Sequence, residues 1–519
     1  MTNEYIKYIQ PRAYINALSK RFWFIHSLGL VKPFLPDWLK CNKKHLKHIL
    51  GKSGYLHVYN IIISSSHNEK EMTLKLANFF SQCGLPDLAA YAYEAYLTFE
   101  KNDPNLHIYL QTLMYTSPDI FDHKYIFDAH TKWGKTLVRT PKYMDYPNAL
   151  TSDRKLKIGY TCHFVTNSTS STLLLPILKS HNRNKVEIFM YSDQDASQTP
   201  DNIRKYAEHW RDTQHLNDDD FCDLIRSDQI DILLELNGHC ATNRYRALTR
   251  KPAPIQISYY NYSSTSGVPE IDYILVGEEV GIDNLQPYYS ETIYHKKGII
   301  IATPISDHFP PVSPPPFLKN GYITFGSFGQ AHKVSHKQIQ LWCEVLKKVS
   351  NSRFYMKANA LDCEVVRSVF MNHFINSGID SHRIILEGGS DYETLLNCYS
   401  KLDITLDTYP FGGGTTPIES IIQGVPVITL VGERFCSWHG YNNMHNIGHD
   451  EFIAQSSEEF VNKAVNLAND KNKLADYRRT LRSSLANSPR GDMKRFINEL
   501  EEAYTDMWNT YIESVKTSM

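Results

Sequence analysis

The spacing of apolar residues changes near residue 150 of the chain. Before that point apolar residues recur every three or four positions, as in amphipathic helices. Within residues 74–104, small and aromatic side chains stand where a helix-turn-helix repeat packs them, at Leu76, Ala77, Phe80, Gly84, Ala89 and Tyr93. We therefore predict an all-helical domain over residues 1–150 that contains one tetratricopeptide-like helix pair.

After residue 150, short apolar runs alternate with helical patterns. The first set of runs covers 157–162, 186–192, 230–236 and 255–261, with helical patterns at 171–181 and 219–228. The second set covers 322–328, 353–358, 383–388, 404–409 and 425–432, with helical patterns at 337–349 and 393–402. This alternation predicts an α/β protein with parallel sheets covered by helices on both faces.

A proline-rich break at 308–321 separates the two sets, because consecutive prolines stiffen the chain and remove ladder hydrogen bonds. We predict two doubly wound domains, at 151–315 and 316–490, that bind ligands at the carboxyl ends of their strands. Residues 493–515 form a long amphipathic pattern. We expect the last segment, 491–519, to be a helix that packs back on these domains.

Composition narrows the class of protein. The chain has 519 residues, 42% of them hydrophobic and 21% charged, which is typical of a soluble globular protein. We expect no membrane span, because no apolar run approaches about 20 residues. Nine cysteines without a CxxC pair, and a start unlike a secretory signal, predict reduced thiols in a cytoplasmic protein. A net charge of −1 gives no support for a nucleic-acid partner.

The stretch YPFGGGTTPIES, residues 409–420, lies between an apolar run and a short apolar helix. Pro417 suits a first helical turn. Thr415 and Thr416 would offer hydroxyl and N–H groups at the positive end of the helix dipole, which favours a phosphate. The stretch is neither a Walker loop nor GxGxxG. The alternative is a tight strand-to-helix turn without a ligand.

Two further segments follow predicted strands. Gln330 and Lys333 come after the strand at 322–328, where a lysine can neutralise a phosphate leaving group or can simply be solvated. Asn237, Gly238 and His239 come after the strand at 230–236. His239 is therefore either a substrate contact or a structural histidine.

In their order along the chain, these segments resemble the catalytic region of the O-linked N-acetylglucosamine transferases, especially the bacterial relatives with short helical repeats. The resemblance covers roughly residues 120–510. It is carried by IFDAHTKWGK, RKLKIGY, IDILLELNGH, RKPAPIQISYYNYSSTSG, IDYILVG, YITFGSFGQAHKVS, DITLDTYPFGGGTTPIESIIQGVPVITLVGER and SPRGDMKRFINELEEAYTDMW.

The resemblance implies a GT-B architecture, with two Rossmann-like domains facing a cleft behind a tetratricopeptide-like domain. It implies an inverting transfer of a sugar, GlcNAc first, from a UDP donor to Ser or Thr side chains of acceptor proteins. It implies no metal and no cofactor beyond the UDP-sugar. The helical domain would select the acceptor proteins.

The resemblance also implies roles for single residues. Lys333 would contact the donor phosphates, with Gln330 beside it, and His239 would lie close to the sugar as a candidate for assisting proton removal. The β-phosphate would be held at Gly413, Gly414, Thr415 and Thr416. Glu419 would face the ribose, and Ser390, in the loop EGGSDYE, would lie near the uracil.

The sequence departs from the family at three places. Asn167 or Ser168 stands where relatives have a histidine, and His163 is nearby but not at the matching position. This position would lie on the acceptor and sugar side of the site, as Asn237 and Gly238 would. Gly414 replaces a donor-side histidine, and residues 394–401 lack the usual arginine. Two alternatives follow: a UDP-glucose-dependent transferase with O- or N-linked products, or a catalytically degenerate scaffold that binds partners.

A metal site is the remaining possibility. His439, His445 and His449 lie close in sequence, the last two at helical i, i+4 spacing. Gly440 and Gly448 interrupt the stretch and no HExxH is present. We therefore predict no metal, and we expect Arg434 and His439 to cover the donor diphosphate.

Overall fold

The computed structural model describes residues 43–100, 104–137, 139, 143, 145–163, 165–166, 168–239, 243–306 and 309–518. Contacts between residues divide the chain into two compact units. The first unit takes residues 1–122, 330–343 and 356–389, and the second takes 123–329, 344–355 and 390–519. The domain boundaries predicted at residues 150, 315 and 490 stay predictions.

The first unit contains the predicted helix pair. Its N-terminal helices are α4 (Lys43–His57), the π-helix η1 (Val58–Ile63), α5 (Glu69–Gln82), α6 (Pro86–Leu97) and α7 (Asn105–Leu113). Asn68 caps α5, because its side chain accepts a hydrogen bond from the Glu71 N–H at 2.9 Å. Helices α5 and α6 pack on each other and bury Leu76, Ala77, Phe80, Ala89 and Tyr93. The predicted pair is therefore confirmed.

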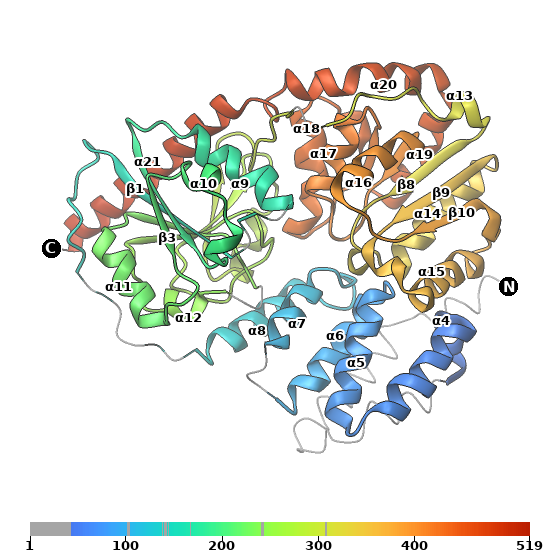
Figure 1. Ribbon diagram of the computed structural model, residues 1–519, viewed down its shortest axis with the longest axis horizontal. Helices are drawn as coiled ribbons and strands as arrows, with labels where there is room; N and C mark the ends of the chain where they lie inside the picture. The colour runs from blue at the N-terminus through green and yellow to red at the C-terminus, as the bar shows by residue number, and fades with distance from the viewer. Residues whose placement is uncertain are drawn as a thin grey trace. The chain divides into compact units, whose positions relative to one another are not determined.

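The rest of the first unit comes from the second α/β region. It includes the start of α14 (His336–Lys348), α15 (Glu364–Asn376) and β10 (Ile384–Glu387). Helix α4 packs against α15 (Figure 1), where the Asn372 amide donates to the carbonyl oxygens of His48 and Ile49 at 2.9 and 3.0 Å. The helical pair thus shares one core with segments far along the chain.

The second unit holds a seven-stranded parallel sheet in the order β3-β2-β1-β4-β5-β6-β7 (Figure 1). Its strands are β1 (Leu156–Cys162), β2 (Val186–Ser192), β3 (His209–Asp212), β4 (Ile232–Glu235), β5 (Ile255–Ser258), β6 (Tyr273–Gly277) and β7 (Thr292–Lys296). The apolar runs predicted four of them. Strands β3 and β7 lie at the edges and are mostly half-buried, so their sequences HWRD and TIYHK carry no apolar run.

The second sheet has six strands in the order β10-β9-β8-β11-β12-β13. They are β8 (Ile323–Ser327), β9 (Ser352–Lys357), β10, β11 (Ile404–Leu406), β12 (Val427–Leu430) and the two-residue β13 (Ile453–Ala454), which the sequence did not predict. The sheet pairs β8–β11, β11–β12 and β12–β13 are parallel. Together the two sheets match the predicted α/β class.

Helices connect these strands. They are α8 (His123–Gly134), α9 (Ser168–Ser180), α10 (Asp201–Arg204), α11 (Asp218–Asp228), α12 (Tyr245–Leu248), α13 (Phe317–Asn320), α16 (Tyr392–Cys398), α17 (Thr415–Ile422), α18 (His439–Asn446), α19 (Ser457–Asn469), α20 (Lys471–Ala486) and α21 (Met493–Ser518). Helix α21 packs on α9, β5 and β7, and its Phe496, Leu500, Tyr504 and Trp508 complete the core of the first sheet. No helix in the described part of the chain is long and apolar enough to cross a membrane.

A buried histidine in the first unit predicts acid sensitivity. The His373 side chain is 0% exposed, its Nδ1 lies 3.2 Å from Nδ1 of His336, and burial lowers its pKa from 6.5 to about 3. The folded state therefore resists protonation of His373, whereas the unfolded chain accepts the proton near pH 6.5. The stability that His373 confers is full above pH 6.5 and is lost as the pH falls towards 3.

We therefore expect the free energy of unfolding, measured with urea, to fall between pH 6.5 and pH 4 by up to about 1.4 kcal/mol per pH unit from this group. The variant His373→Gln should flatten this slope. Replacing the exposed His382 by Gln should leave the slope unchanged. Equal slopes in the wild type and His373→Gln would contradict the prediction.

Candidate active site

The second sheet changes direction between β8 and β11. The chain runs outward from β8 to β9 and β10, returns to β11, and then runs outward to β12 and β13. Strands β8 and β11 are parallel neighbours, with Phe325 opposite Ile404. Such a switch point is where open parallel sheets bind ligands. In the sequence, Gln330 and Lys333 follow β8 and the glycine loop follows β11, which are the two strands that flank this point.

A buried carboxylate shapes the glycine loop. Asp407, directly after β11, is 5% exposed. Its carboxylate accepts hydrogen bonds from the N–H groups of Thr408 and Gly413 and from the Thr429 hydroxyl, each at 2.9 Å. A buried ionised carboxylate needs such donors, because each replaces water that burial removes. Asp407 therefore fixes both ends of the loop, a role that sequence reasoning missed.

The three glycines of the loop have different reasons for lacking a side chain. A Cβ on Gly413 would lie 2.5 Å from Cδ of Pro417, and one on Gly412 would lie 3.2 Å from the backbone nitrogen of Gly440. A Cβ on Gly414 would have no heavy atom within 4 Å. The first two glycines permit close packing, whereas Gly414 faces open space.

Helix α17 begins directly after that open position. Gly414 is its N-cap residue, and Gly414, Thr415 and Thr416 are half-buried in a loop whose preceding residues are buried. The Asn443 amide donates to the carbonyl oxygens of Gly413 and Gly414, at 3.2 and 2.9 Å. The loop carbonyls are thereby occupied, and the accessible part is the N-terminus of α17, where N–H groups and the helix dipole favour an anion.

Glu419 lies one helical turn further along α17 and is 3% exposed. Its carboxylate accepts hydrogen bonds from the hydroxyls of Tyr392 and Tyr399, at 2.9 and 3.1 Å, while burial raises its pKa. Tyr399 also donates to the carbonyl of Thr416, at 3.1 Å. Glu419 thus ties α16 and the following turn to the start of α17. Its expected contact with a ribose stays a prediction.

The other donor-side residues lie on loops. Lys333 ends the short 3₁₀ turn η4 (Ala331–Lys333), and its N–H donates to the carbonyl of Gln330 at 3.0 Å. Gln330 and Lys333 are counted with the first unit, whereas Gly413–Thr416 and Glu419 belong to the second. Ser390 is exposed, and its hydroxyl donates to the carbonyl of Asp391 at 3.1 Å. Their expected contacts with the donor stay predictions.

The first sheet has its own switch point between β1 and β4. Beyond it, Glu235 is 1% exposed and accepts hydrogen bonds from the N–H groups of Asn237 and Gly238, at 2.8 and 2.9 Å. Burial raises the pKa of Glu235 to about 7. The Asn237 side-chain oxygen accepts from the His163 N–H at 2.6 Å, and the Asn237 side chain, together with the two N–H groups, helps to hold down the pKa of Glu235.

His239 is enclosed rather than presented to solvent. It is 0% exposed, and its Nε2 donates to the Ser266 carbonyl at 2.8 Å. Four rings surround it at centroid distances of 4.6 to 5.0 Å: His130 and Trp133 from α8, Tyr245 and Tyr262. Sequence reasoning did not connect α8 with His239. The predicted part of His239 in proton removal stays untested, and the side chains of Asn167 and Ser168 lie outside the described residues.

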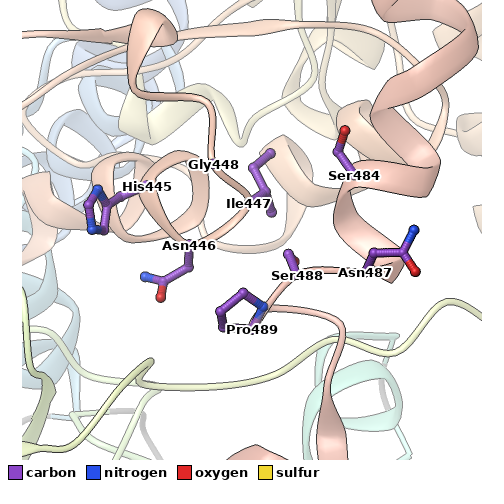
Figure 2. Close-up of a pocket in the computed structure, with 8 residues that line it drawn as sticks. All are labelled: His445, Asn446, Ile447, Gly448, Ser484, Asn487, Ser488 and Pro489. Atoms are coloured by element: carbon purple, nitrogen blue, oxygen red, sulfur yellow. The ribbon is translucent and has the colours of Figure 1, made fainter.

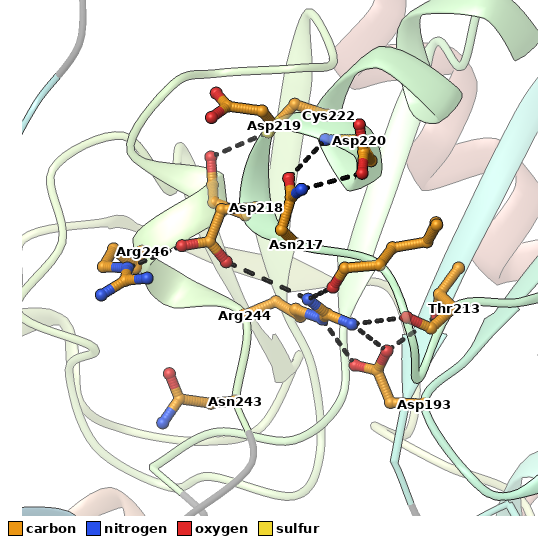
Figure 3. A network of polar contacts seen from close by, with 12 residues as sticks. Asp193, Thr213, Asn217, Asp218, Asp219, Asp220, Cys222, Asn243, Arg244 and Arg246 are labelled. Atoms are coloured by element: carbon orange, nitrogen blue, oxygen red, sulfur yellow. Dashed lines mark hydrogen bonds and ion pairs between the residues drawn. The ribbon is translucent and has the colours of Figure 1, made fainter.

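A charged cluster ties the loops at the edge of the first sheet together (Figure 3). Arg244 donates to both carboxylate oxygens of Asp193 at 2.9 and 2.6 Å, and Thr213 donates to the same carboxylate at 2.8 Å. Asp193 follows β2, Thr213 follows β3 and Arg244 precedes α12. Bidentate arginine–carboxylate pairs of this kind are geometrically specific. The cluster fixes three segments that emerge from the carboxyl edge of the sheet.

The three histidines considered for a metal have other partners. His439 Nε2 lies 2.7 Å from the Ser263 hydroxyl, and His445 and His449 pair with Asp450 and Glu451 at 2.8 and 2.9 Å. Among the described residues, no group of three or more His, Cys, Asp or Glu side chains is placed to hold a metal ion.

His445 also lines a pocket of about 330 Å³ between the ends of α18 and α20 (Figure 2), which contains none of the predicted site residues.

Comparison with known proteins identifies the family. The sequence profile of glycosyl transferase family 41 matches residues 125–308 and 317–500. The chain belongs to glycosyl transferase family 41. Family membership agrees with the resemblance stated from the motifs, and the matched ranges cover both sheets.

Plant proteins are among the relatives of the chain. The chain is 33% identical over 400 residues to a probable UDP-N-acetylglucosamine–peptide N-acetylglucosaminyltransferase SPINDLY of Hordeum vulgare, over 75% of this chain and 42% of that protein. It is 30% identical over 370 residues to the probable transferase SEC of Arabidopsis thaliana, over 69% of this chain and 38% of that protein. This family 41 chain thus spans about two fifths of the length of the curated relatives it matches.

A solved structure agrees with the fold. A lysine-to-methionine variant of the O-GlcNAc transferase of Thermobaculum terrenum superposes with a TM-score of 0.81, at 24% identity, over 98% of this chain and 99% of that chain. With two parallel Rossmann-like sheets preceded by helices, the family 41 chain has the predicted GT-B fold.

The glycine loop gives a direct stability test. Gly413→Ala should lower the free energy of unfolding by about 1–3 kcal/mol, because its Cβ would meet the Pro417 ring at 2.5 Å. Gly414→Ala should change it by no more than about 0.5 kcal/mol, because that position is open. Chemical denaturation of both variants measures the difference. Equal losses would show that the loop does not have this packing.

Proposed function

We propose that the chain is a metal-independent, inverting glycosyltransferase that moves a sugar, GlcNAc as the first candidate, from a UDP donor to Ser or Thr side chains of proteins. Membership of glycosyl transferase family 41 supports transfer of a sugar. The names of its plant relatives support a UDP-GlcNAc donor and a peptide acceptor. The observation that carries the proposal is the open N-terminus of α17 beside the switch point of the second sheet.

The donor diphosphate would bind at Gly414, Thr415 and Thr416. In sugar transfer, the bond between the anomeric carbon and the diphosphate oxygen breaks, and negative charge develops on the departing UDP. Fixed N–H groups at a helix N-terminus stabilise such charge without reorganising during the reaction. Lys333 would add a positive charge and Gln330 a hydrogen bond, so the chain's own groups would do the work that a metal does elsewhere.

The acceptor and sugar would bind at the edge of the first sheet. The Asn237 side chain, which follows β4 and whose oxygen accepts from the His163 N–H, would donate from Nδ2 to a sugar or acceptor oxygen. His239 is enclosed by four rings and bonded to the Ser266 carbonyl, so we assign it to holding the turn at Gly238 rather than to contact with the reacting atoms. The helical pair of the first unit would bind acceptor proteins, as helical repeats commonly do.

The open space at Gly414 is a reason to test a second sugar donor. The resemblance to the family implies a donor-side histidine at this position, and here a Cβ would have no heavy atom within 4 Å. UDP-glucose, with a free hydroxyl in place of the acetamido group, is therefore the alternative donor. Purified protein should be incubated with UDP-GlcNAc, UDP-glucose and UDP-galactose, and the modified peptides should be analysed by mass spectrometry.

Replacement of Lys333 tests the chemistry. We expect Lys333→Ala and Thr416→Val to lower kcat by about 10²–10³-fold, as loss of a charge-stabilising group does, with the thermal unfolding midpoint unchanged. Lys337→Ala, which removes an exposed lysine just four positions on, is the matched control and should retain activity. Normal turnover by Lys333→Ala would overturn the proposed mechanism.

Removal of metal gives an independent test. We expect transfer in the presence of EDTA at the same rate as without it, because the stabilising charges come from the chain. A rate that falls with EDTA and returns with Mg²⁺ or Mn²⁺ would contradict the proposal. Absence of both UDP binding and transfer would instead favour a partner-binding scaffold.

A further inference from the structure

The N-terminal helices reach the turn that carries Lys333. We define the helical lobe as residues 43–100 and 104–121, and the Lys333 turn as residues 330–334. We propose that the helical lobe holds the Lys333 turn in position, so that Gly84 and Tyr115 are positioning residues for the donor lysine. This inference rests on the proposed function for the part played by Lys333.

Gly84 brings two backbones together. It lies in the turn between α5 and α6 with φ +70°, a left-handed conformation that favours glycine. A Cβ at Gly84 would lie 2.6 Å from the carbonyl oxygen of Val334 and 3.0 Å from Cζ of Phe370 on α15. No side chain fits between the α5–α6 turn and the backbone of the Lys333 turn. The lobe and the turn are therefore in direct contact on the C-terminal side of Lys333.

Tyr115 makes the contact on the other side. Its ring, just beyond α7, lies 4.9 Å from the ring of His332, with an interplanar angle of 44°. Ring pairs at such distances attract each other beyond the effect of burying their area. The two residues that flank Lys333 in sequence, His332 and Val334, thus each contact a different element of the lobe.

Hydrogen bonds and packing both shape the Lys333 turn. Within it, the Lys333 N–H donates to the Gln330 carbonyl and the Val334 N–H donates to the Ala331 carbonyl, both at 3.0 Å. Ala331 and Val334 are 2% and 0% exposed, so they anchor the turn by packing. A lysine ammonium stabilises a leaving group only when it is held at the right place. Removal of the lobe contacts should move Lys333 without removing its charge.

A double-mutant cycle tests this coupling in the full-length protein. We expect Tyr115→Ala to lower kcat at least about tenfold and to weaken UDP binding, measured by calorimetry, while Tyr115→Phe stays within about twofold of the wild type. His332→Ala, which removes the partner ring from the turn, should have the same effect as Tyr115→Ala. Tyr59→Ala is the matched control, because Tyr59 lies in the same lobe but its ring lies 4.5 Å from that of Tyr55.

The decisive measurement is made in the Lys333→Ala background. If Tyr115 acts through Lys333, adding Tyr115→Ala to Lys333→Ala should change the Kd of UDP by less than about twofold, because the coupled residues are not additive. An equal loss of UDP affinity in both backgrounds, or an unimpaired Tyr115→Ala enzyme, would overturn the inference. A wild type that neither binds UDP nor transfers sugar would overturn the proposed function instead.

Hydrogen exchange tests the contact between the helical lobe and the Lys333 turn independently of sugar transfer. Amide exchange in a peptide covering residues 328–336 should be faster in Tyr115→Ala than in the wild type, while a peptide covering α17 should be unchanged. This readout needs no substrate. Unchanged exchange at 328–336 would show that the lobe does not hold the turn, whatever the activity of the variant.

Discussion

The buried carboxylate of Asp407 is the constraint on which the candidate site depends. It lies at the end of β11, where removal of water would leave an ionised group without partners, and three donors replace that water. Two of these donors are N–H groups of the loop itself. The hydrogen bonds to the Asp407 carboxylate therefore also determine the path of residues 408–413. The path leaves Gly414 in open space at the first turn of α17. The hydrogen bonds of the buried Asp407 carboxylate thus determine where the N-terminus of α17 is open to an anion.

The first sheet uses the same arrangement. Glu235 ends β4, just beyond the switch point, and accepts hydrogen bonds from the two N–H groups that follow it in the loop. Complete burial outweighs these hydrogen bonds and raises the pKa of Glu235 to about 7, so its charge is only partly maintained near neutral pH. In both sheets a strand-end carboxylate bends the following loop back on itself. Each of these loops then carries a polar group at the edge of its sheet. In the second sheet this group is the start of α17, and in the first sheet it is Nδ2 of Asn237.

Apolar runs in the sequence predicted most of the buried strands, such as β1, β2 and β4, although the buried β6 (Tyr273–Gly277) was missed. They failed for β3, whose residues His209–Asp212 are half-buried, because an edge strand needs no continuous apolar run. The glycine loop was placed correctly from sequence, but the separate reasons for its three glycines were not. The reason at Gly412 is tertiary, since it meets the backbone of Gly440, which is far along the chain, whereas Gly413 meets Pro417 of the same stretch.

The surroundings of His239 show the same limit. His239 was selected because it follows a strand, and that position is local information. Its enclosure depends on His130 and Trp133, more than one hundred residues earlier in sequence, and on the close approach of Gly134 to Gly267. A Cβ at Gly134 would lie 1.9 Å from the Gly267 carbonyl oxygen, so α8 can reach the ring only because both positions are glycine. Pairings of this kind have no signature in a single sequence.

The contacts of the helical lobe with residues 330–337 differ in how strongly they couple the positions of the two segments. The Asp119–Lys337 ion pair, at 2.7 Å, has both side chains largely in solvent, at 72% and 48% exposure, so it adds little and tolerates displacement. The Gly84–Val334 contact is backbone against backbone in a close-packed region, where no flexible side chain can absorb a shift. Movement of the α5–α6 turn must therefore move Val334 or open a void against Phe370. For that reason the coupling between lobe and lysine resides in the Gly84 and Tyr115 contacts rather than in surface charge.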